Sequence, residues 1–418
     1  MSGYRYALIF FVCLASSLTV KAQRKPEDHF RSVSQVRLDL RELGYPPADV
    51  IPSGESAVHA LAVAPNGTVY GATSGKRAHL FALDPRIGYV QPLGYIPQAS
   101  GVHRSLVVSR SGDVFLGTNR GVDNDGKGFE KYEGGHLWKY SPPSDQLLRP
   151  IRVDQPCDGL INLGVPVPGE AIYSLAIDRD RDTIYGLSYP HGRFFTFPIK
   201  EGKARVVGKV AEKEMPGELF ENEKNVARAV VVDREGNVYA SGEGGKLFRF
   251  DAKRQILEPL PLTAPTVPGR EQYNRVDAWA VDSCGLLYGG TSDGYLFRLD
   301  PRSLRLTNLG KPLNQYRIRG LAWSSNGRLY GVGGDADEIC RLFSYDPADG
   351  AYELLGMIEV NRRPFYTWQA YTIDAVILGP DETLYLGESE RRSKLYLFYP
   401  PPTGRVAGCE RPRAKARP

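Results

Sequence analysis

The 418-residue sequence is poor in the residues on which several common kinds of site depend. It has only five cysteines and four tryptophans. No two cysteines form a Cys-x-x-Cys pair, so neither a zinc-binding nor a redox motif is indicated. Four tryptophans are too few for the docking repeats of a quinone-dependent dehydrogenase. The His-Glu-x-x-His and P-loop motifs are also missing, which argues against the zincins and nucleotide-binding proteins that carry them.

Long apolar runs are missing after the N-terminus, which argues against membrane insertion. The one apolar run, residues 6–20, follows Arg5 and ends at Val20-Lys21-Ala22. This is the plan of a secretory signal peptide at residues 1–22, and the run is too short for a comfortable membrane span. Cys13 lies within the run, so a lipoprotein anchor is not indicated. We therefore expect a secreted or periplasmic protein.

An excess of charge of one sign is also absent from the main body of the chain. The net charge of +5 comes from the signal peptide, which contributes +2, and from the tail at residues 410–418, which contributes +3. The neutral body gives no support for binding to nucleic acid. The tail, which we place at residues 406–418, is expected to be a solvated segment, with a polyanion-binding arm as the alternative.

What the sequence does have is a sevenfold repeat. Each copy has an apolar β-type run, a turn with Gly, Asn or Asp, and a strand with a Tyr or Phe near its start, followed by two more strands. The aromatic residues are Tyr70, Phe115, Tyr185, Tyr239, Tyr288, Tyr330 and Tyr385. Steps of 42 to 70 residues and the lack of helical periodicity predict an all-β fold, a seven-bladed β-propeller at residues 23–405.

The seventh copy lacks a fourth strand, because only a Pro-containing basic tail follows it. At the other end of the chain, residues 32–44 precede the first copy and have a strand-like pattern. We expect this N-terminal strand to complete blade seven and so to close the ring. We expect the protein to be monomeric.

A ring of polar residues is predicted at one mouth of the propeller channel. When the innermost strands are aligned on their apolar positions, a polar residue stands two places earlier in each. The members are His59, Arg104, Tyr173, Arg228, Asp277, Arg319 and Asp374. Any water-filled channel mouth has polar residues, so a purely structural ring stays open as an alternative. We expect His59 and Asp374 to be structural, since blades one and seven meet there.

Blades two and three carry further candidates beside this ring. A bulge at the start of blade two would turn His103 inward, and a long insert in that blade ends at His136. The equivalent loop of blade three presents Tyr189, His191 and Arg193. These types serve as general acids, bases or anion clamps. No third ligand accompanies the two histidines of blade two, and Asp-Asn-Asp-Gly-Lys-Gly at residues 123–128 fits no calcium-loop register, so no metal is expected.

The segments "GVHRSLVV…GGHLWKY" and "AIYSLAI…GLSYPHGRFF" resemble the propeller polysaccharide lyases, the ulvan lyases of families 24 and 25, and related propellers acting on rhamnose–glucuronate linkages. The resemblance in architecture covers nearly the whole mature chain, whereas the site motifs lie on blades two and three. It implies His103 and Tyr173 as acid and base, His136 as the loop histidine, and Arg193, with Arg228 as a rival, facing the uronate carboxylate. The insert separates His103 from His136 by more than the resemblance leads us to expect.

This resemblance implies an exported lyase that needs no cofactor and cleaves an acidic polysaccharide by β-elimination. An arginine would neutralise the uronate carboxylate, and Tyr and His would move the protons. Residues expected to bind the substrate are Tyr189, His191, Arg228, Asp277 and Arg319. Two alternatives remain: a propeller that binds a glycan or a protein without catalysis, and a glycoside hydrolase of the rhamnosidase type.

Overall fold

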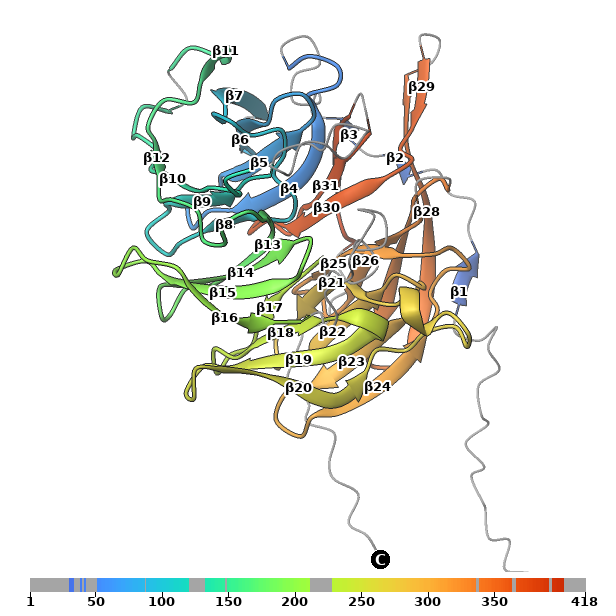
Figure 1. The fold of residues 1–418 in the computed structure, drawn as a ribbon. Coiled ribbons are helices and arrows are strands. Elements are labelled where there is room, and N and C mark those ends of the chain that lie inside the picture. Colours follow the sequence, from blue (N-terminus) through green and yellow to red (C-terminus); the bar gives the residue numbers. More distant parts are fainter. Residues whose placement is uncertain are drawn as a thin grey trace, which may run out of the picture.

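The computed structural model describes residues 30–33, 38–39, 41–42, 51–86, 88–119, 132–146, 149–210, 228–335, 338–362, 366–390 and 393–401. These residues form seven β-sheets that follow one another around a central channel (Figure 1). The predicted seven-bladed β-propeller is therefore confirmed. The predicted signal peptide, the tail and residues 123–128 lie outside the described residues and stay predictions.

Within each blade the strands lie side by side, from the innermost strand next to the channel to the outermost strand at the rim. The innermost strands are β4 (Ala57–Val63), β8 (Leu106–Val108), β13 (Ala171–Asp178), β17 (Val231–Val232), β21 (Val276–Val281), β25 (Ile318–Trp323) and β30 (Ile373–Leu378). The second strands are β5 (Val69–Ser74), β9 (Val114–Gly117), β14 (Thr183–Tyr189), β18 (Val238–Ser241), β22 (Leu287–Thr291), β26 (Leu329–Gly333) and β31 (Leu384–Glu388).

The outer half of each blade follows the same order. The third strands are β6 (His79–Asp84), β10 (Leu137–Tyr140), β15 (Arg193–Pro198), β19 (Lys246–Asp251), β23 (Leu296–Asp300), β27 (Arg341–Asp346) and β32 (Leu395–Phe398). The fourth strands are β7 (Tyr89–Tyr95), β12 (Leu160–Asn162), β16 (Arg205–Lys209), β20 (Ile256–Thr263), β24 (Arg305–Gly310), β28 (Ala351–Arg362) and, in blade seven, β3 (Arg41–Glu42).

Some blades carry additions. Strand β11 (Arg152–Pro156) adds to blade one, and β29 (Tyr366–Gln369) pairs with β28 in blade six. Two short 3₁₀ helices, η4 (Glu243–Gly245) and η5 (Glu271–Tyr273), lie in the loops of blades four and five. Among the described residues, no helix has the length and apolar character that crossing a membrane requires.

The N-terminal segment closes the ring. Strand β3 pairs antiparallel with β32, with Arg41 opposite Leu397 and Glu42 opposite Tyr396. The closure predicted for blade seven is thereby confirmed. The rest of the predicted strand behaves differently: β1 (Phe30–Val33) and β2 (Leu38–Asp39) both run parallel to β28 of blade six. The segment therefore links the last two blades.

The repeated Tyr-Gly pair is explained by packing between strands and blades. The seven repeat aromatics are all buried, at 2% exposure or less. The glycine after four of them gives room to a phenylalanine opposite on the third strand. At Gly289, an added Cβ would lie 2.2 Å from the ring of Phe297. Each hydrophobic cluster between blades combines residues of two neighbouring sheets, so the core is a ring of sheet-to-sheet contacts.

Candidate functional site at one mouth of the channel

β-Bulges place most of the predicted polar ring. In five blades, the pairing of the innermost strand with the second strand shifts register at one residue, which is left unpaired. A bulge bends its strand and turns the extra side chain in a new direction. The bulged residues are His59, Tyr173, Asp277, Arg319 and Asp374. The structure therefore brings these predicted ring members together by one repeated irregularity.

Arg104, the ring member of blade two, extends across the channel. It lies before β8 and has a positive φ of 22°. Its guanidinium donates hydrogen bonds to the main-chain oxygen of Asp277 in blade five and, at 2.6 Å, to that of Arg319 in blade six. It also lies 3.6 Å from the Asp374 carboxylate of blade seven. One side chain thus links four blades at the mouth.

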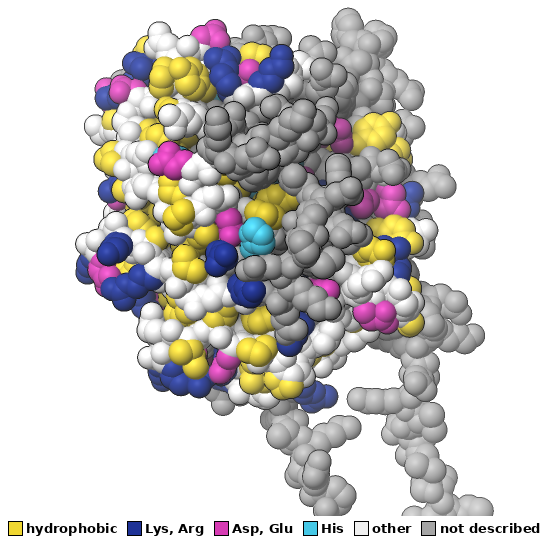
Figure 2. All heavy atoms as spheres, viewed as in Figure 1, with side chains coloured by type: hydrophobic (Ala, Val, Ile, Leu, Met, Phe, Trp, Pro, Cys, Tyr) yellow, Lys and Arg dark blue, Asp and Glu magenta, His cyan; other side chains and the backbone are white. Residues whose placement is uncertain are grey.

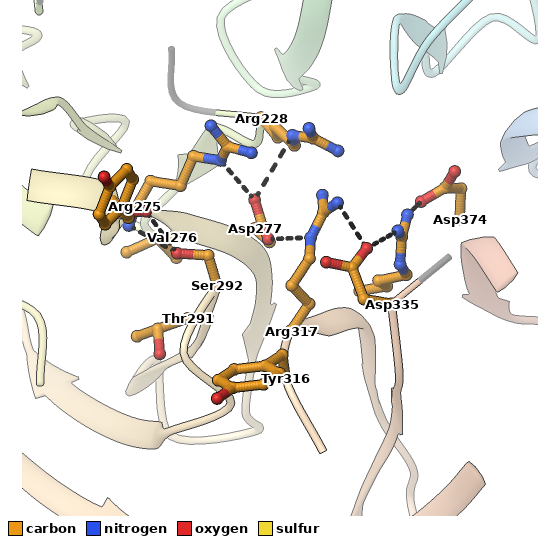
Figure 3. Close-up of polar contacts among 12 residues, drawn as sticks. Arg228, Arg275, Val276, Asp277, Thr291, Ser292, Tyr316, Arg317, Asp335 and Asp374 are labelled. Atoms are coloured by element: carbon orange, nitrogen blue, oxygen red, sulfur yellow. Dashed lines mark hydrogen bonds and ion pairs between the residues drawn. The ribbon is translucent and has the colours of Figure 1, made fainter. Parts of the chain in front are cut away.

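Asp277 is the centre of an arginine cluster (Figure 3). Its carboxylate is fully buried and lies 2.9 Å from Arg317 Nε, 3.3 Å from Arg275 Nε and 3.8 Å from Arg228 Nε. Burial alone would raise the pKa of Asp277, but the positive charges of the surrounding arginines outweigh it and hold the pKa well below its ordinary value. Asp277 is therefore a fixed negative charge.

Asp374 of blade seven is held in a similar way by its own neighbours. Its carboxylate lies 2.5 Å from Arg319 Nη1 and 3.1 Å from His59 Nδ1. Burial opposes ionisation here too, yet the charge of Arg319 and the hydrogen bond from His59 keep the pKa of Asp374 well below its ordinary value. Asp335 bridges Arg317 and Arg319, at 3.2 and 2.6 Å. His59 and Asp374, which we expected to be structural, thus contact each other.

Positive charge is in excess in this network. Its described members are Arg104, Arg228, Arg275, Arg317 and Arg319 against Asp277, Asp335 and Asp374. Burial lowers the pKa of Arg275 to about 10, so this arginine still carries its charge at neutral pH. The mouth is therefore suited to an anionic group.

Below the polar ring the channel is apolar. A cavity of ≈ 220 Å³ is lined by the residues on which the innermost strands were aligned: Leu61, Leu106, Leu175, Val230, Trp279, Leu321 and Val376. Arg104, Arg319 and Asp374 line the same cavity at its polar end. A ligand would therefore meet the polar side chains at the mouth, above the apolar part of the channel.

His103 lies in a row of rings on the blade-one to blade-three side. Its ring centroid is 4.6 Å from that of His59 and 5.2 Å from that of Tyr173, and the His103 and Tyr173 planes differ by only 19°. Tyr189 continues the row, 5.7 Å from Tyr173. Among the described residues, no hydrogen bond engages the His103 ring nitrogens or the Tyr173 hydroxyl. Both side chains are partly exposed.

The arginine cluster faces this row. Burial, and then the charge of His59, hold the pKa of His103 well below its ordinary value, and Arg228 and Arg104 act in the same direction. His103 is therefore a neutral imidazole. Tyr173 is close enough to Arg275 to act on the pKa of that arginine. Arg228 thus acts electrostatically on His103, and Tyr173 acts on Arg275, at the channel mouth.

The other candidates of blades two and three lie apart from this space. His136 Nδ1 is 3.1 Å from Asn162 Oδ1 on β12, and its ring packs on Trp138. Arg193 Nε and His191 Nδ1 both contact the buried Glu170 carboxylate, at 2.7 and 3.1 Å. Among the described residues, no ring contact or hydrogen bond joins these three side chains to His103 or Tyr173.

Three further features complete the description of the site. Arg275 and Arg317 were not predicted from the sequence, although each stands two residues before a ring member. Residues 290–294, Gly-Thr-Ser-Asp-Gly, match the Gly-x-Ser-x-Gly motif of a nucleophile elbow. They form a turn between two strands, however, and the Ser292 hydroxyl donates to the Tyr273 carbonyl at 3.0 Å. Within the described residues, no group of three or more metal-binding side chains is found.

No family model matches the sequence, and no curated protein matches it significantly. Many solved structures share the fold. A streptogramin B lyase superposes with a TM-score of 0.59 at 13% identity, covering 86% of this chain and 97% of that chain. A catalytically inactive virginiamycin B lyase from Staphylococcus aureus, solved with quinupristin, gives 0.57 at 11% identity, covering 86% and 99%.

A periplasmic gluconolactonase from Pseudomonas aeruginosa gives a TM-score of 0.51 at 17% identity, covering 74% of this chain and 87% of that chain. None of these three proteins is a polysaccharide lyase. At such low identities the similarity shows the β-propeller fold, and proteins of quite different function share it.

Proposed function

We propose that this protein is a lyase that cleaves a uronic-acid-containing polysaccharide by β-elimination at the mouth formed by blades one to five. The observation that carries the proposal is the arrangement of His103 and Tyr173. Their rings are stacked at 5.2 Å, neither has a hydrogen-bond partner among the described residues, and Arg228 and Arg275 face them. This combines a proton acceptor, a proton donor and a carboxylate clamp.

The first step needs an arginine. The proton on C5 of a uronic acid becomes acidic only when the adjacent carboxylate is neutralised, and guanidinium groups bind carboxylates through paired hydrogen bonds. Arg228 has the more suitable position, because its charge acts directly on His103. Arg193, favoured by the family resemblance, is bound to the buried Glu170 and lies 41% exposed on blade three. We therefore assign the clamp to Arg228, assisted by Arg275.

The proton transfers then follow from the state of each group. Neutral His103 takes the C5 proton, the C4–C5 double bond forms, and the C4–O4 bond breaks. Tyr173 gives its hydroxyl proton to the departing O4, and the nearby Arg275 stabilises the resulting phenolate. Proton exchange with water restores both groups. No cofactor takes part in this scheme.

Two further observations support the setting of this reaction. Cys284 forms a disulfide, whereas Cys157 and Cys340 are buried and free. A disulfide fits an exported protein, as the N-terminal sequence predicts. Charged side chains of both signs lie in small groups over the visible described surface, without a large basic patch (Figure 2).

The test is the ultraviolet absorbance of the unsaturated uronate product. Purified protein is incubated with a panel of uronate polymers across a range of pH. Absorbance that grows with time for one polymer, and that is lost in the Tyr173→Phe variant, supports the lyase. Binding of a polymer that is recovered intact would select the non-catalytic glycan-binding alternative. Release of reducing sugar without the absorbance would select a hydrolase.

A further inference from the structure

The segment that carries His103 is held differently from the equivalent segments of the other blades. In the five blades with a bulge, the innermost strand continues through the ring residue. In blade two, strand β8 begins only at Leu106, and residues 101–105 have one isolated bridge, between Gly101 and Asn119. The β-ladder of blade two therefore does not fix the position of His103.

The main chain of Arg104 bonds to the neighbouring blades instead. Its N–H donates to the His59 carbonyl at 3.2 Å in blade one, and its carbonyl accepts from the Leu175 N–H at 3.0 Å in blade three. The rings of His59 and Tyr173, one on each of these blades, enclose the ring of His103. The main-chain bonds of Arg104 thus fix the distance between blades one and three, and the His103 ring lies between them.

The side chain of Arg104 completes this fixation from across the channel. Its two bonds to the carbonyl oxygens of Asp277 and Arg319 are charge-assisted and buried. The residue also has a positive φ, which non-glycine residues adopt only when their surroundings hold them there. Gly101 and Ser105 bond to Asn119 and Gly117 of blade two at the two ends of the segment, but no described hydrogen bond of that blade holds residues 102–104 between them.

We infer that Arg104 is a positioning residue that locks His103 against Tyr173 by attaching blade two to blades five and six across the channel. This inference rests on the proposed function for its kinetic consequence, whereas its structural consequence is measurable without a substrate. Loss of the Arg104 side chain loosens residues 102–104, so that the His103 ring leaves its position between the two rings. The turnover number then falls, whereas substrate binding through Arg228 and Arg275 is retained.

The chain offers a matched control at the other end of the channel. Arg179 of blade three donates to the Val108 carbonyl at 2.9 Å in blade two and to the Val63 carbonyl at 3.0 Å in blade one. Burial lowers the pKa of Arg179, as it does that of Arg104. Arg179→Ala therefore removes the same kind of bond between blades without touching the segment of His103.

The experiment compares Arg104→Ala, Arg104→Lys and Arg179→Ala in the full chain. Proton NMR of the histidine ring signals, with His103 assigned by its loss in His103→Gln, follows the titration of His103 in each variant. In Arg104→Ala we expect the pKa of His103 to rise towards its ordinary value, both because burial is lost and because the charge of Arg104, which also lowers this pKa, is removed. Arg104→Lys keeps the positive charge, so a rise in that variant reports the change of position. With a cleaved polymer, kcat should fall by about 10- to 100-fold and KM by no more than about threefold. Added ethylguanidinium should restore part of kcat.

The outcomes separate the two proposals. An unchanged His103 titration in a folded Arg104→Ala protein overturns the positioning role, and so does an Arg179→Ala variant that shifts His103 equally. A titration that shifts in Arg104→Lys as well as in Arg104→Ala, in a protein that cleaves no uronate polymer, keeps the positioning role and overturns the lyase. If Arg104→Ala does not fold, Arg104→Lys decides, because a single ammonium cannot bond both carbonyl oxygens in the guanidinium geometry and should give the same shift in smaller degree.

Discussion

The two sides of the channel mouth hold their polar groups in different ways. On the side of blades four to seven, two buried carboxylates are each surrounded by arginines or histidine at ion-pair distance. On the side of blades one to three, His103 and Tyr173 contact their neighbours through ring faces, and their polar atoms have no partner among the described residues. Charged side chains that are paired hold one another in place and create an electrostatic field. Neutral polar groups without a hydrogen-bond partner can instead exchange protons with a substrate. We therefore propose that the proton transfers take place on the side of blades one to three, whereas the charged network on the other side provides stability and, through Arg228 and Arg275, the carboxylate clamp.

Removing the central carboxylate should have the largest effect on stability. Asp277→Ala leaves Arg228, Arg275 and Arg317 buried without their counter-charge, and breaking such a buried pair costs about 3–5 kcal/mol. Urea denaturation monitored by circular dichroism would measure this loss. A loss below about 1 kcal/mol would contradict the stabilising role that we give to this side.

Tyr173→Phe should give the reverse pattern. The change keeps the ring between His103 and Tyr189 but removes the hydroxyl, so the free energy of unfolding should change by less than about 1 kcal/mol. Turnover of a cleaved polymer should fall by at least ~100-fold with KM nearly unchanged. Full activity in this variant would remove the proton donor from our scheme.

Arg228→Ala should affect both binding and turnover, since the clamp holds the carboxylate in the ground state and in the transition state. We expect KM to rise and kcat/KM to fall by about 100-fold. Arg193→Ala is the comparison, because this arginine is tied to Glu170 outside the site and its loss should change kcat/KM by no more than about threefold. If Arg193→Ala is the more damaging of the two, the clamp lies on blade three, as the sequence resemblance implies.

Lowering the pH should reduce the free energy of unfolding in two separate pH ranges, one for the histidines and one for the carboxylates. Burial lowers the pKa of His103 and of the buried His79 below the ordinary 6.5, so the fold favours their neutral forms. The stability that they contribute is complete above pH 6.5 and is lost as the pH falls through their lowered values, by up to about 1.4 kcal/mol per pH unit for each group. Asp277 and Asp374 have lowered pKa values and contribute stability above about pH 3.8 that is lost only below it.

Urea denaturation at a series of pH values would show these two ranges. A His103→Gln variant should have a shallower slope below pH 6.5 and an unchanged slope below pH 3.8. An unaltered slope in the upper range would mean that His103 is not held neutral in the folded protein.

His59→Ala should have the smallest effect on activity. His59 lies at the height of the ring, but its Nδ1 is engaged by Asp374, and its loss should lower the melting temperature while leaving turnover near that of the wild type. Activity abolished in a folded His59→Ala protein, together with full activity in Tyr173→Phe, would place the site on other blades.

The fold was predictable from the sequence because each blade repeats the same local chemistry. The buried aromatic and the turn residues recur in each copy, a glycine follows the aromatic in four of them, and the missing fourth strand of blade seven indicated where the N-terminus must pair. The polar ring was also predictable, since its members hold equivalent positions in equivalent strands. Pairing of β1 and β2 with blade six was not, because parallel edge strands carry no distinct pattern.

The partners within the site were much less predictable. Arg104 crosses to the far side of the channel, and Arg228 of blade four acts on the pKa of His103, because distances across a propeller depend on how far each side chain reaches. The loop histidine His136 was grouped with His103 because both belong to blade two, yet its partner is Asn162 at the rim. Sequence position specifies the blade and the end of the strand, whereas contacts between blades need the three-dimensional arrangement.

The pairing of β3 with β32 also has a consequence for the time at which the ring can form. Arg41 and Leu397 are more than 350 positions apart in the chain. A ribosome adding about 5–20 residues per second has therefore been at work for tens of seconds before the partner of β3 exists. During that interval β3 cannot pair with β32, and the blades already synthesised form an open arc with exposed strand edges. A nascent chain kept extended until synthesis ends, as during translocation across a membrane, would avoid this exposure.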